Sequence, residues 1–114
     1  MPVIKYEDLE RQAVLMDGVR DADKAVPIDS ELWPDHVVRV FKLAPGGHTP
    51  SHFHDWEHVN YVVKGRGRLT IDGTAHELSE KDFAVVPPNA KHQFENPYDE
   101  EFEFICIVPE RGEY

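Results

Sequence analysis

The chain has 114 residues, enough for one hydrophobic core but not for two. Its net charge of −10, from 12 basic and 22 acidic residues, argues against binding to nucleic acids or to anionic membranes. No apolar run approaches the roughly 20 residues that span a bilayer, and no basic segment precedes an apolar stretch at the N-terminus. We therefore expect neither a transmembrane helix nor a signal peptide. The only cysteine, Cys106, cannot form an intramolecular disulfide, which favours a cytoplasmic location.

The N-terminal segment is the least regular part of the sequence. Residues 9–16 are compatible with a short helical turn or with an irregular arm, and Asp17-Gly18 is typical of a turn. We expect residues 1–24 to form an arm. No repeat, linker or low-complexity tract divides the sequence, so residues 1–114 are predicted to be one domain.

From Trp33 onward, the hydrophobic pattern has the period of β-strands and no helical period of useful length. The first strand is expected to stop at Pro45-Gly46-Gly47, and Asp72-Gly73 predicts a two-residue hairpin turn. The predicted strands are residues 38–43, 58–63, 69–71, 75–78, 83–86, 92–95 and 102–108. Short strands separated by turn residues predict an all-β sandwich or barrel, with the barrel over residues 36–108.

Four of the seven histidines occupy positions that a barrel would bring together. His52 and His54 are two residues apart, so on a strand both rings would point to the same face. His58 opens the next predicted strand, and His92 follows the Pro87-Pro88-Asn89 turn. Imidazole nitrogen suits Zn, Cu, Fe and Ni, whereas Ca and Mg prefer oxygen. We predict one divalent transition metal bound by His52, His54, His58 and His92, and no metal role for the other histidines, His36, His48 and His76.

The spacing of these residues resembles the two motifs of the cupin superfamily. The first motif reads Gly46, five residues, His52-x-His54, three residues, His58, six residues and Gly65. The second reads Pro87-x-Asn89, two residues, His92, three residues and Asn96. The motifs cover residues 46–96, nearly half of the chain. The resemblance implies a cupin double-stranded β-helix, or jelly-roll, barrel.

Three positions depart from the cupin pattern. Lys81 and Asn89 stand where cupins have turn glycines. Lys81 is acceptable if its φ stays negative, and asparagine tolerates the left-handed region best after glycine. His58 stands where most cupins have a glutamate ligand. The run His-x-His-x-Trp-Glu-His at residues 52–58 is similar to that of small single-domain cupins with four histidine ligands, a subgroup that includes manganese-containing proteins with oxidative activity.

Glu57 is an alternative ligand because it directly precedes His58. Neighbouring residues on a strand point to opposite faces, so only one of the two can comfortably reach the metal. The six-residue gap to Gly65 in the family motif selects His58. Glu57 and Asp55 then either accept hydrogen bonds from ligand imidazoles or lie on the rim as surface charges.

Few other side chains are candidates for the chemistry. Cys106 alternates with Phe102, Phe104 and Val108 on the last strand, so we expect it to point into the barrel beside the metal. It is a candidate catalytic residue, and the alternative is that it packs as a small buried apolar side chain, as buried free cysteine commonly does. Asn60, Phe104 and Cys106 are predicted to line the substrate pocket.

Four neutral imidazoles leave the charge of a divalent ion uncancelled and two octahedral positions open, which favours anionic or enolisable substrates. Any of Mn, Fe, Ni, Cu or Zn is chemically compatible, and the resemblance favours Mn or Fe. Without a glutamate ligand, chemistry like that of oxalate decarboxylase is disfavoured. We predict a metal-dependent oxidoreductase of dioxygenase type that acts on a small organic substrate.

Two alternatives remain open. One is a non-catalytic module that binds or senses a small molecule, supported by the lack of a convincing acid–base residue. The other is a metal-dependent isomerase or lyase that needs no oxygen. In all three cases we expect a homodimer, because a small barrel with Val38, Val40 and Phe41 on an early strand gains burial by pairing.

Overall fold

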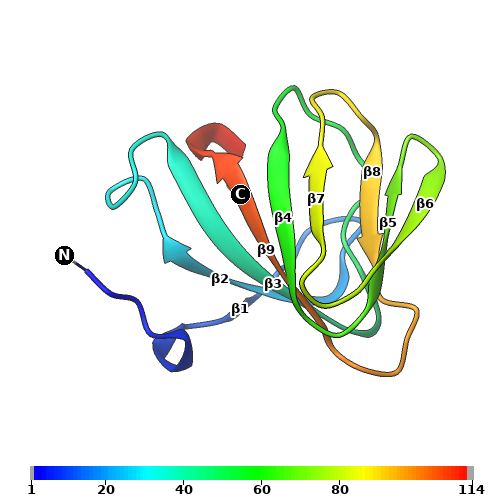
Figure 1. Ribbon diagram of the computed structural model, residues 1–114, viewed down its shortest axis with the longest axis horizontal. Coiled ribbons are helices and arrows are strands. Elements are labelled where there is room, and N and C mark those ends of the chain that lie inside the picture. The colour runs from blue at the N-terminus through cyan, green and yellow to red at the C-terminus, as the bar shows by residue number, and fades with distance from the viewer. Residues whose placement is uncertain (1, 113–114) are drawn as a thin grey trace.

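The computed structural model describes residues 2–112, and they form one antiparallel sheet that curls into an open barrel (Figure 1). The strands are β1 (Gln12–Ala13), β2 (Arg20–Ile28), β3 (His36–His48), β4 (His58–Lys64), β5 (Gly67–Ile71), β6 (Thr74–Leu78), β7 (Phe83–Val86), β8 (His92–Glu95) and β9 (Phe102–Pro109). Two short 3-10 helices are η1 (Tyr6–Asp8) and η2 (Glu110–Gly112). The predicted all-β class is confirmed. No helix in residues 2–112 is long and apolar enough to cross a membrane.

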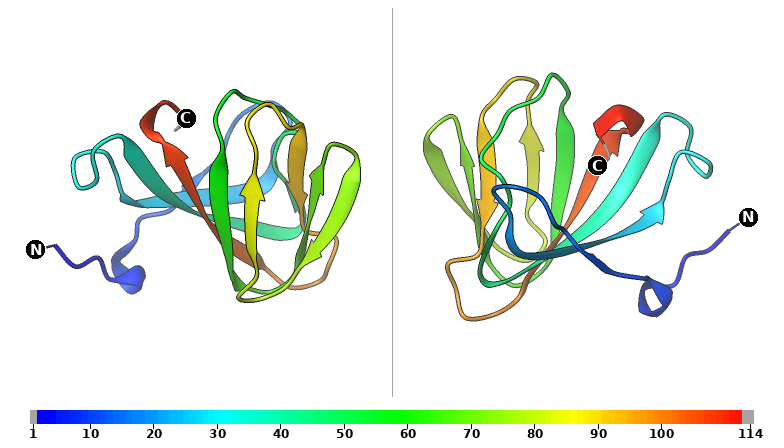
Figure 2. Two further views of the ribbon diagram at one scale, coloured as in Figure 1. Left: turned by 45° about the horizontal axis from the view of Figure 1, so that its top comes forward. Right: turned by 180° about the vertical axis from the view of Figure 1, so that it is seen from behind.

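The strand order β6-β5-β8-β3-β9-β4-β7 brings segments from both halves of the sequence side by side. β3 lies between β2 and β9 along most of its length, and only its last residue, His48, pairs with Glu95 of β8. β3 therefore links the β2-β3-β9-β4-β7 part of the sheet to the β8-β5-β6 part, and the two parts enclose the interior (Figure 2).

β3 is longer than the sequence predicts. The expected stop at Pro45-Gly46-Gly47 is wrong, because Gly46 takes a φ of 83° and its N–H donates to the Asn96 carbonyl at 2.8 Å. The backbone bends there without leaving the sheet. This bend carries the chain from one part of the sheet to the other and directs it toward the segment that holds His52 and His54.

β2 is absent from the predicted strands. Its sequence, RDADKAVPI, begins with four charged residues among its first five, and Ala25 is its only buried residue. Its strand conformation comes from pairing with β3, in which Lys24 faces Phe41 and Ala25 faces Val40. β2 overlaps the predicted arm at residues 20–24, and the one helical turn of the N-terminal segment, η1, lies earlier than residues 9–16.

The N-terminal segment is attached by a small ionic network. Arg11 contacts Asp23 at 3.0 Å and Glu103 at 2.8 Å, and the Tyr6 hydroxyl also donates to Glu103. Glu103 is only 3% exposed, so its carboxylate depends on these donors. Val40 and Phe41, which we expected to offer apolar surface to a second chain, are each 4% exposed within this one. The homodimer stays a prediction.

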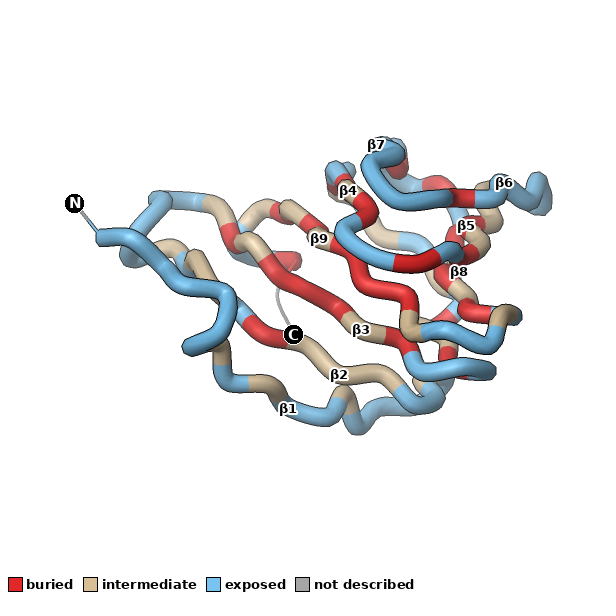
Figure 3. Tube along the Cα trace, turned by 60° about the horizontal axis from the view of Figure 1, so that its bottom comes forward, coloured by how far each residue is buried: buried red, intermediate tan, exposed pale blue. Residues whose placement is uncertain are grey.

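The hydrophobic core fills the space between the two parts of the sheet. β3 and β9 contribute much of it, with buried residues over the first part of β3 and along β9 (Figure 3). Its fully buried large side chains are Leu43, Val62, Leu69, Val86, Phe102, Phe104 and Val108. This packing is continuous with a cavity at one end of the barrel, where the histidines gather.

The turn residues have the sign of φ that the sequence predicts, except at Lys81. Asp72 and Gly73 have φ values of 47° and 84°, as a two-residue hairpin requires. Asn89 has a φ of 68°, in the left-handed region it tolerates. Lys81 has a φ of 74°, so the condition that it keep a negative φ is not met. The Lys81 N–H donates to the Val62 carbonyl at 2.9 Å, and this bond holds the turn.

A Lys81→Gly variant is expected to be more stable than the natural chain by about 0.5–1 kcal/mol. Glycine relieves the cost of a left-handed backbone, and the extra flexibility of its unfolded state offsets part of that gain. Urea unfolding measures the change. Asn89→Gly is the matched control, with a smaller gain expected because asparagine already accommodates a positive φ. A Lys81→Gly protein no more stable than the natural chain would contradict this account of the turn.

Candidate metal centre

The segment between β3 and β4 positions two of the four histidines. His52 donates its N–H to the His92 carbonyl at 3.1 Å, and His92 donates to the His52 carbonyl at 2.9 Å. The N–H of Asn89 donates to the His54 carbonyl at 2.7 Å. The two motifs are therefore joined through their backbones, and His52 and His54 lie on an extended loop between the strands.

Burial alternates along this loop as it would along a strand. The even-numbered residues from His52 to His58 point inward, and Ser51, Phe53, Asp55 and Glu57 are exposed. Glu57 therefore points away from the histidines. Asp55 forms a surface ion pair with Arg111 at 3.4 Å. In the described part of the chain, the Nδ1 atoms of His54, His58 and His92 face oxygens of Trp56, Asn60 and Ala90 and neither of these carboxylates, so both carboxylates belong to the rim.

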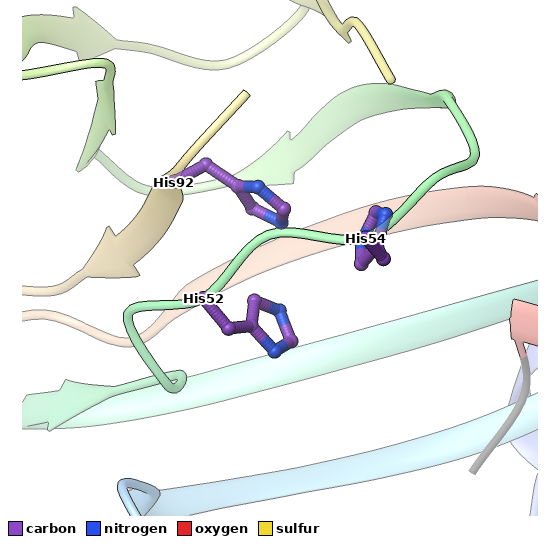
Figure 4. Close-up of side chains that lie close together, drawn as sticks. All are labelled: His52, His54 and His92. Atoms are coloured by element: carbon purple, nitrogen blue, oxygen red, sulfur yellow. The ribbon is translucent and has the colours of Figure 1, made fainter. Parts of the chain in front are cut away.

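Three of the imidazole rings lie close together, those of His52, His54 and His92 (Figure 4). His52 and His54 from the loop and His92 from β8 each place one ring nitrogen within 4.8 Å of the others. His58, at the start of β4, places its Nε2 atom 3.2 Å from the Nε2 atom of His92. Metal–nitrogen bonds of about 2.0–2.1 Å place two nitrogens on one ion roughly 3 Å apart. His52, His54 and His92 fit a divalent transition metal, and His58 is the candidate fourth ligand.

Three of the rings are held with their Nε2 atoms free for a metal. The Nδ1 atoms of His54 and His92 lie 2.8 Å from the Trp56 carbonyl and 2.9 Å from the Ala90 carbonyl. The Nδ1 atom of His58 lies 2.7 Å from Oδ1 of Asn60. Because these oxygens only accept, each Nδ1 carries the proton and each Nε2 keeps its lone pair. Such partners orient ligand imidazoles in metal sites.

The cavity in front of the rings is small and mostly apolar apart from them. Its free space measures about 20 Å³, against roughly 10–15 Å³ needed to hold one water molecule. Phe104 and Cys106 lie on its wall, where we expected them, beside Phe41 and Phe94. Asn60 is not among its lining residues, because its side chain lies behind His58 and donates to the Ile105 carbonyl at 3.4 Å. Whether Asn60, Phe104 and Cys106 take part in substrate binding, and Cys106 in catalysis, stays a prediction.

Arg39 is the residue of this site that the sequence analysis missed. It lies on β3, is 3% exposed, and forms part of the cavity wall. The sequence does contain an indication of it. Arg39 occupies an inward position between Val37 and Phe41, where a strand with this alternation is expected to carry an apolar residue. A buried cation at such a position indicates a function or a specific structural partner.

The histidines are held in their neutral form. Burial lowers the pKa of His52, of His58 and of His92 from the usual 6.5 to about 4 in each case, and it lowers the pKa of His54 as well. Neighbouring imidazoles add to the effect on His52, and the hydrogen bond to Asn60 partly opposes it on His58. Because metal ligands must be unprotonated, the site is ready to bind an ion at neutral pH.

This burial has an expected consequence for the metal-free chain. The unfolded chain takes up these protons near pH 6.5 and the folded chain only near pH 4. Between these values the unfolded state binds more protons, so the free energy of unfolding should fall as pH falls through that window. Urea unfolding of chelator-treated protein across the window measures it, and His58→Gln should flatten the dependence. A stability that is constant across the window would contradict the buried, neutral cluster.

Comparison with known proteins identifies the family. The cupin-domain family model matches residues 39–108, more than half of the chain. The chain belongs to the cupin-domain family. The double-stranded β-helix fold that the sequence predicts is thereby confirmed.

Individual relatives agree on the fold and differ in what they are named for. A 1-methylthio-D-xylulose 5-phosphate methylsulfurylase from Rhodospirillum rubrum is 32% identical over 71 residues, which are 62% of this chain and 46% of that protein. The polyketide cyclase RemF from Streptomyces resistomycificus has 26% identity and a TM-score of 0.89, over 96% of this chain and 80% of that one. A predicted oxalate decarboxylase from Thermotoga maritima superposes with a TM-score of 0.87 at 18% identity, over 95% and 98% of the two chains. The chain spans less than half the length of the curated relatives it matches.

Proposed function

We propose that this chain is a metal-dependent oxidoreductase of dioxygenase type, with one divalent ion held by His52, His54, His58 and His92. The observation that carries the proposal is the convergence of His52, His54 and His92, and the Nε2 atom of His58 lies 3.2 Å from that of His92. Manganese or iron is the favoured ion. When bound, such an ion supplies Lewis-acid activation and, for a redox-active metal, dioxygen chemistry.

The chain's own residues bind and orient the substrate and exclude water from it. Phe94 and Phe104 stack with ring centroids 4.3 Å apart and form an apolar wall beside the histidines. His58 and His92 are each 3% exposed, whereas His52 and His54 are half-buried, so the cavity opens on the side of the loop. A small substrate would enter there, with its reacting atoms toward the four histidines.

The lack of an acidic base near the histidines supports oxidation over proton-transfer chemistry. None of the ten residues that line the cavity in the described part of the chain is Asp or Glu. Reactions that depend on a positioned carboxylate would need another group. Oxidation by dioxygen places less demand on such a base.

A second candidate is oxygen-independent Lewis-acid catalysis, such as a cyclisation or lyase reaction. The similarity to RemF, a polyketide cyclase, and to a methylsulfurylase favours it. Both candidates use the same metal centre. They differ in whether dioxygen is consumed.

Oxygen uptake separates the two candidates. Protein loaded with Mn or Fe is incubated with enol, catechol and alkene compounds in air and under argon, with substrate loss and oxygen consumption both recorded. We expect turnover in air only, lost in His58→Ala and kept in His76→Ala, whose residue is exposed on β6. Turnover that persists under argon would establish the second candidate. Tight ligand binding without turnover under either gas would leave a binding module instead.

A further inference from the structure

A tryptophan beside the metal centre makes two contacts with one of the histidines. The indole ring of Trp56 stacks on the imidazole ring of His54, with the ring centroids 4.3 Å apart and the two planes within 3° of parallel. The backbone carbonyl of Trp56 also faces the Nδ1 atom of His54 at 2.8 Å. Trp56 therefore holds this imidazole twice, in the plane of the ring through its carbonyl and on the face of the ring through its indole.

The barrel packing holds His54 less tightly than it holds two of the other histidines. His54 lies on the loop between β3 and β4 and is half-buried, whereas His58 and His92 begin strands and are each 3% exposed. The rings of His52, His58 and His92 are tilted from that of His54 by 55° or more. Among the described residues, the indole of Trp56 is the only ring that stacks parallel to any of these four imidazoles.

The C-terminal turn η2 supports the indole from another side. Gly112 is buried, and a Cβ atom added there would lie 2.6 Å from the Nε1 atom of Trp56. Arg111 places its guanidinium carbon 5.6 Å from the centroid of the Trp56 ring and pairs with Asp55 at 3.4 Å. Trp56 also packs against the hydrophobic core. The indole is thus held between the core, η2 and His54.

We propose that Trp56 is a positioning residue for His54, and that its indole, supported by η2, holds this imidazole in its metal-binding orientation. Any residue at position 56 would supply the backbone carbonyl, so the proposed effect belongs to the side chain. Stacked planar rings stabilise each other, and an imidazole that is already oriented loses less freedom when it binds a metal. This inference rests on the metal centre proposed above, and it gives Trp56 no chemical step.

A double-mutant cycle between Trp56 and His54 tests the proposal. Zinc affinity is measured by competition with chelators of graded strength for the natural chain, Trp56→Leu, His54→Ala and the double variant. Thermal unfolding of each metal-free protein is recorded. Leucine keeps the backbone carbonyl and an apolar side chain but cannot stack. Trp33→Leu is the matched control, because Trp33 stacks on His36 with centroids 4.1 Å apart and neither residue lines the metal cavity.

We expect Trp56→Leu to bind zinc about tenfold more weakly than the natural chain, at the lower end of the usual effect of losing a residue that orients a metal ligand. In the His54→Ala background, the same substitution should change the affinity by less than about twofold, because the ring that Trp56 orients is gone. Trp56→Phe should recover most of the affinity, since it restores a ring that can stack. Trp33→Leu should match the natural chain.

Equal losses of zinc affinity in the two backgrounds would overturn the proposal, because a general loosening of the barrel does not depend on His54. Unchanged affinity in Trp56→Leu would also overturn it. If Trp56→Leu does not fold, Gly112→Ala takes its place, since the added Cβ atom would displace the indole from the side of η2. Zinc affinity in Gly112→Ala equal to that of the natural chain would then overturn the proposal.

The test separates this inference from the proposed metal centre. A natural chain that binds no zinc would overturn the metal centre, and the role of Trp56 with it. Zinc binding that is weakened in His54→Ala but insensitive to Trp56→Leu would overturn the role of Trp56 alone and leave the metal centre in place.

Discussion

Replacing His58 by alanine is expected to weaken metal binding by more than about 100-fold, because even residues that only orient a metal ligand are commonly worth about 10–100-fold. His58 is the proposed fourth ligand, and its Nε2 atom lies 3.2 Å from that of His92. Competition with a chromophoric chelator measures the affinity. Elemental analysis of the purified proteins gives the metal content.

The matched control is His76→Ala, which removes an imidazole from an exposed position on β6. It should bind metal as tightly as the natural chain. Thermal unfolding of the metal-free proteins shows whether His58→Ala remains folded. A folded His58→Ala protein with the affinity of the natural chain would mean that only His52, His54 and His92 hold the metal.

Replacing Gly65 by alanine is expected to destabilise the protein by more than about 3 kcal/mol. Gly65 has a φ of 78°, and an added Cβ atom would lie 2.2 Å from the carbonyl oxygen of Glu101. Backbone atoms on both sides of this contact would have to move, and the segment of residues 97–101 leads directly into β9. Gly65, the last glycine of the first cupin motif, is therefore required by its close approach to the Glu101 carbonyl as well as by its φ.

Gly73→Ala is the control for this prediction. Gly73 has a φ of 84°, but nothing lies within 4 Å of an added Cβ atom. Its substitution should cost about 1 kcal/mol, the usual penalty of a positive φ alone. Urea unfolding measures both variants. Equal losses at Gly65 and Gly73 would show that the contact with Glu101 relaxes easily and that only the backbone angle matters.

The sequence predicted best those features that depend on residues close together in the chain, such as turns and the direction in which side chains point. The Asp72-Gly73 hairpin follows from the positive φ that both residues accept. The inward direction of His52, His54 and His58 follows from residue spacing, and it survives on a loop because backbone bonds to β8 keep that loop extended. Local patterns of this kind depend on few distant contacts.

Features that depend on distant partners could not be predicted from the sequence. β2 begins with a charged segment that has no alternating apolar pattern, and it becomes a strand through pairing with β3. The acceptors for His54 and His92 are backbone carbonyls, which every residue has. Asn60 was expected to face the cavity, but β4 places it against the Nδ1 atom of His58. Lys81 reached a positive φ because its turn is closed by the Val62 carbonyl.

X-ray absorption spectroscopy of the metal-loaded chain tests the four-histidine centre most directly. The number of imidazole rings around the ion can be read from the multiple-scattering pattern that imidazole ligands produce. We predict one ion per chain with four imidazole nitrogens, and with one fewer in His58→Ala. Three imidazoles in the natural chain, unchanged in His58→Ala, would contradict the account.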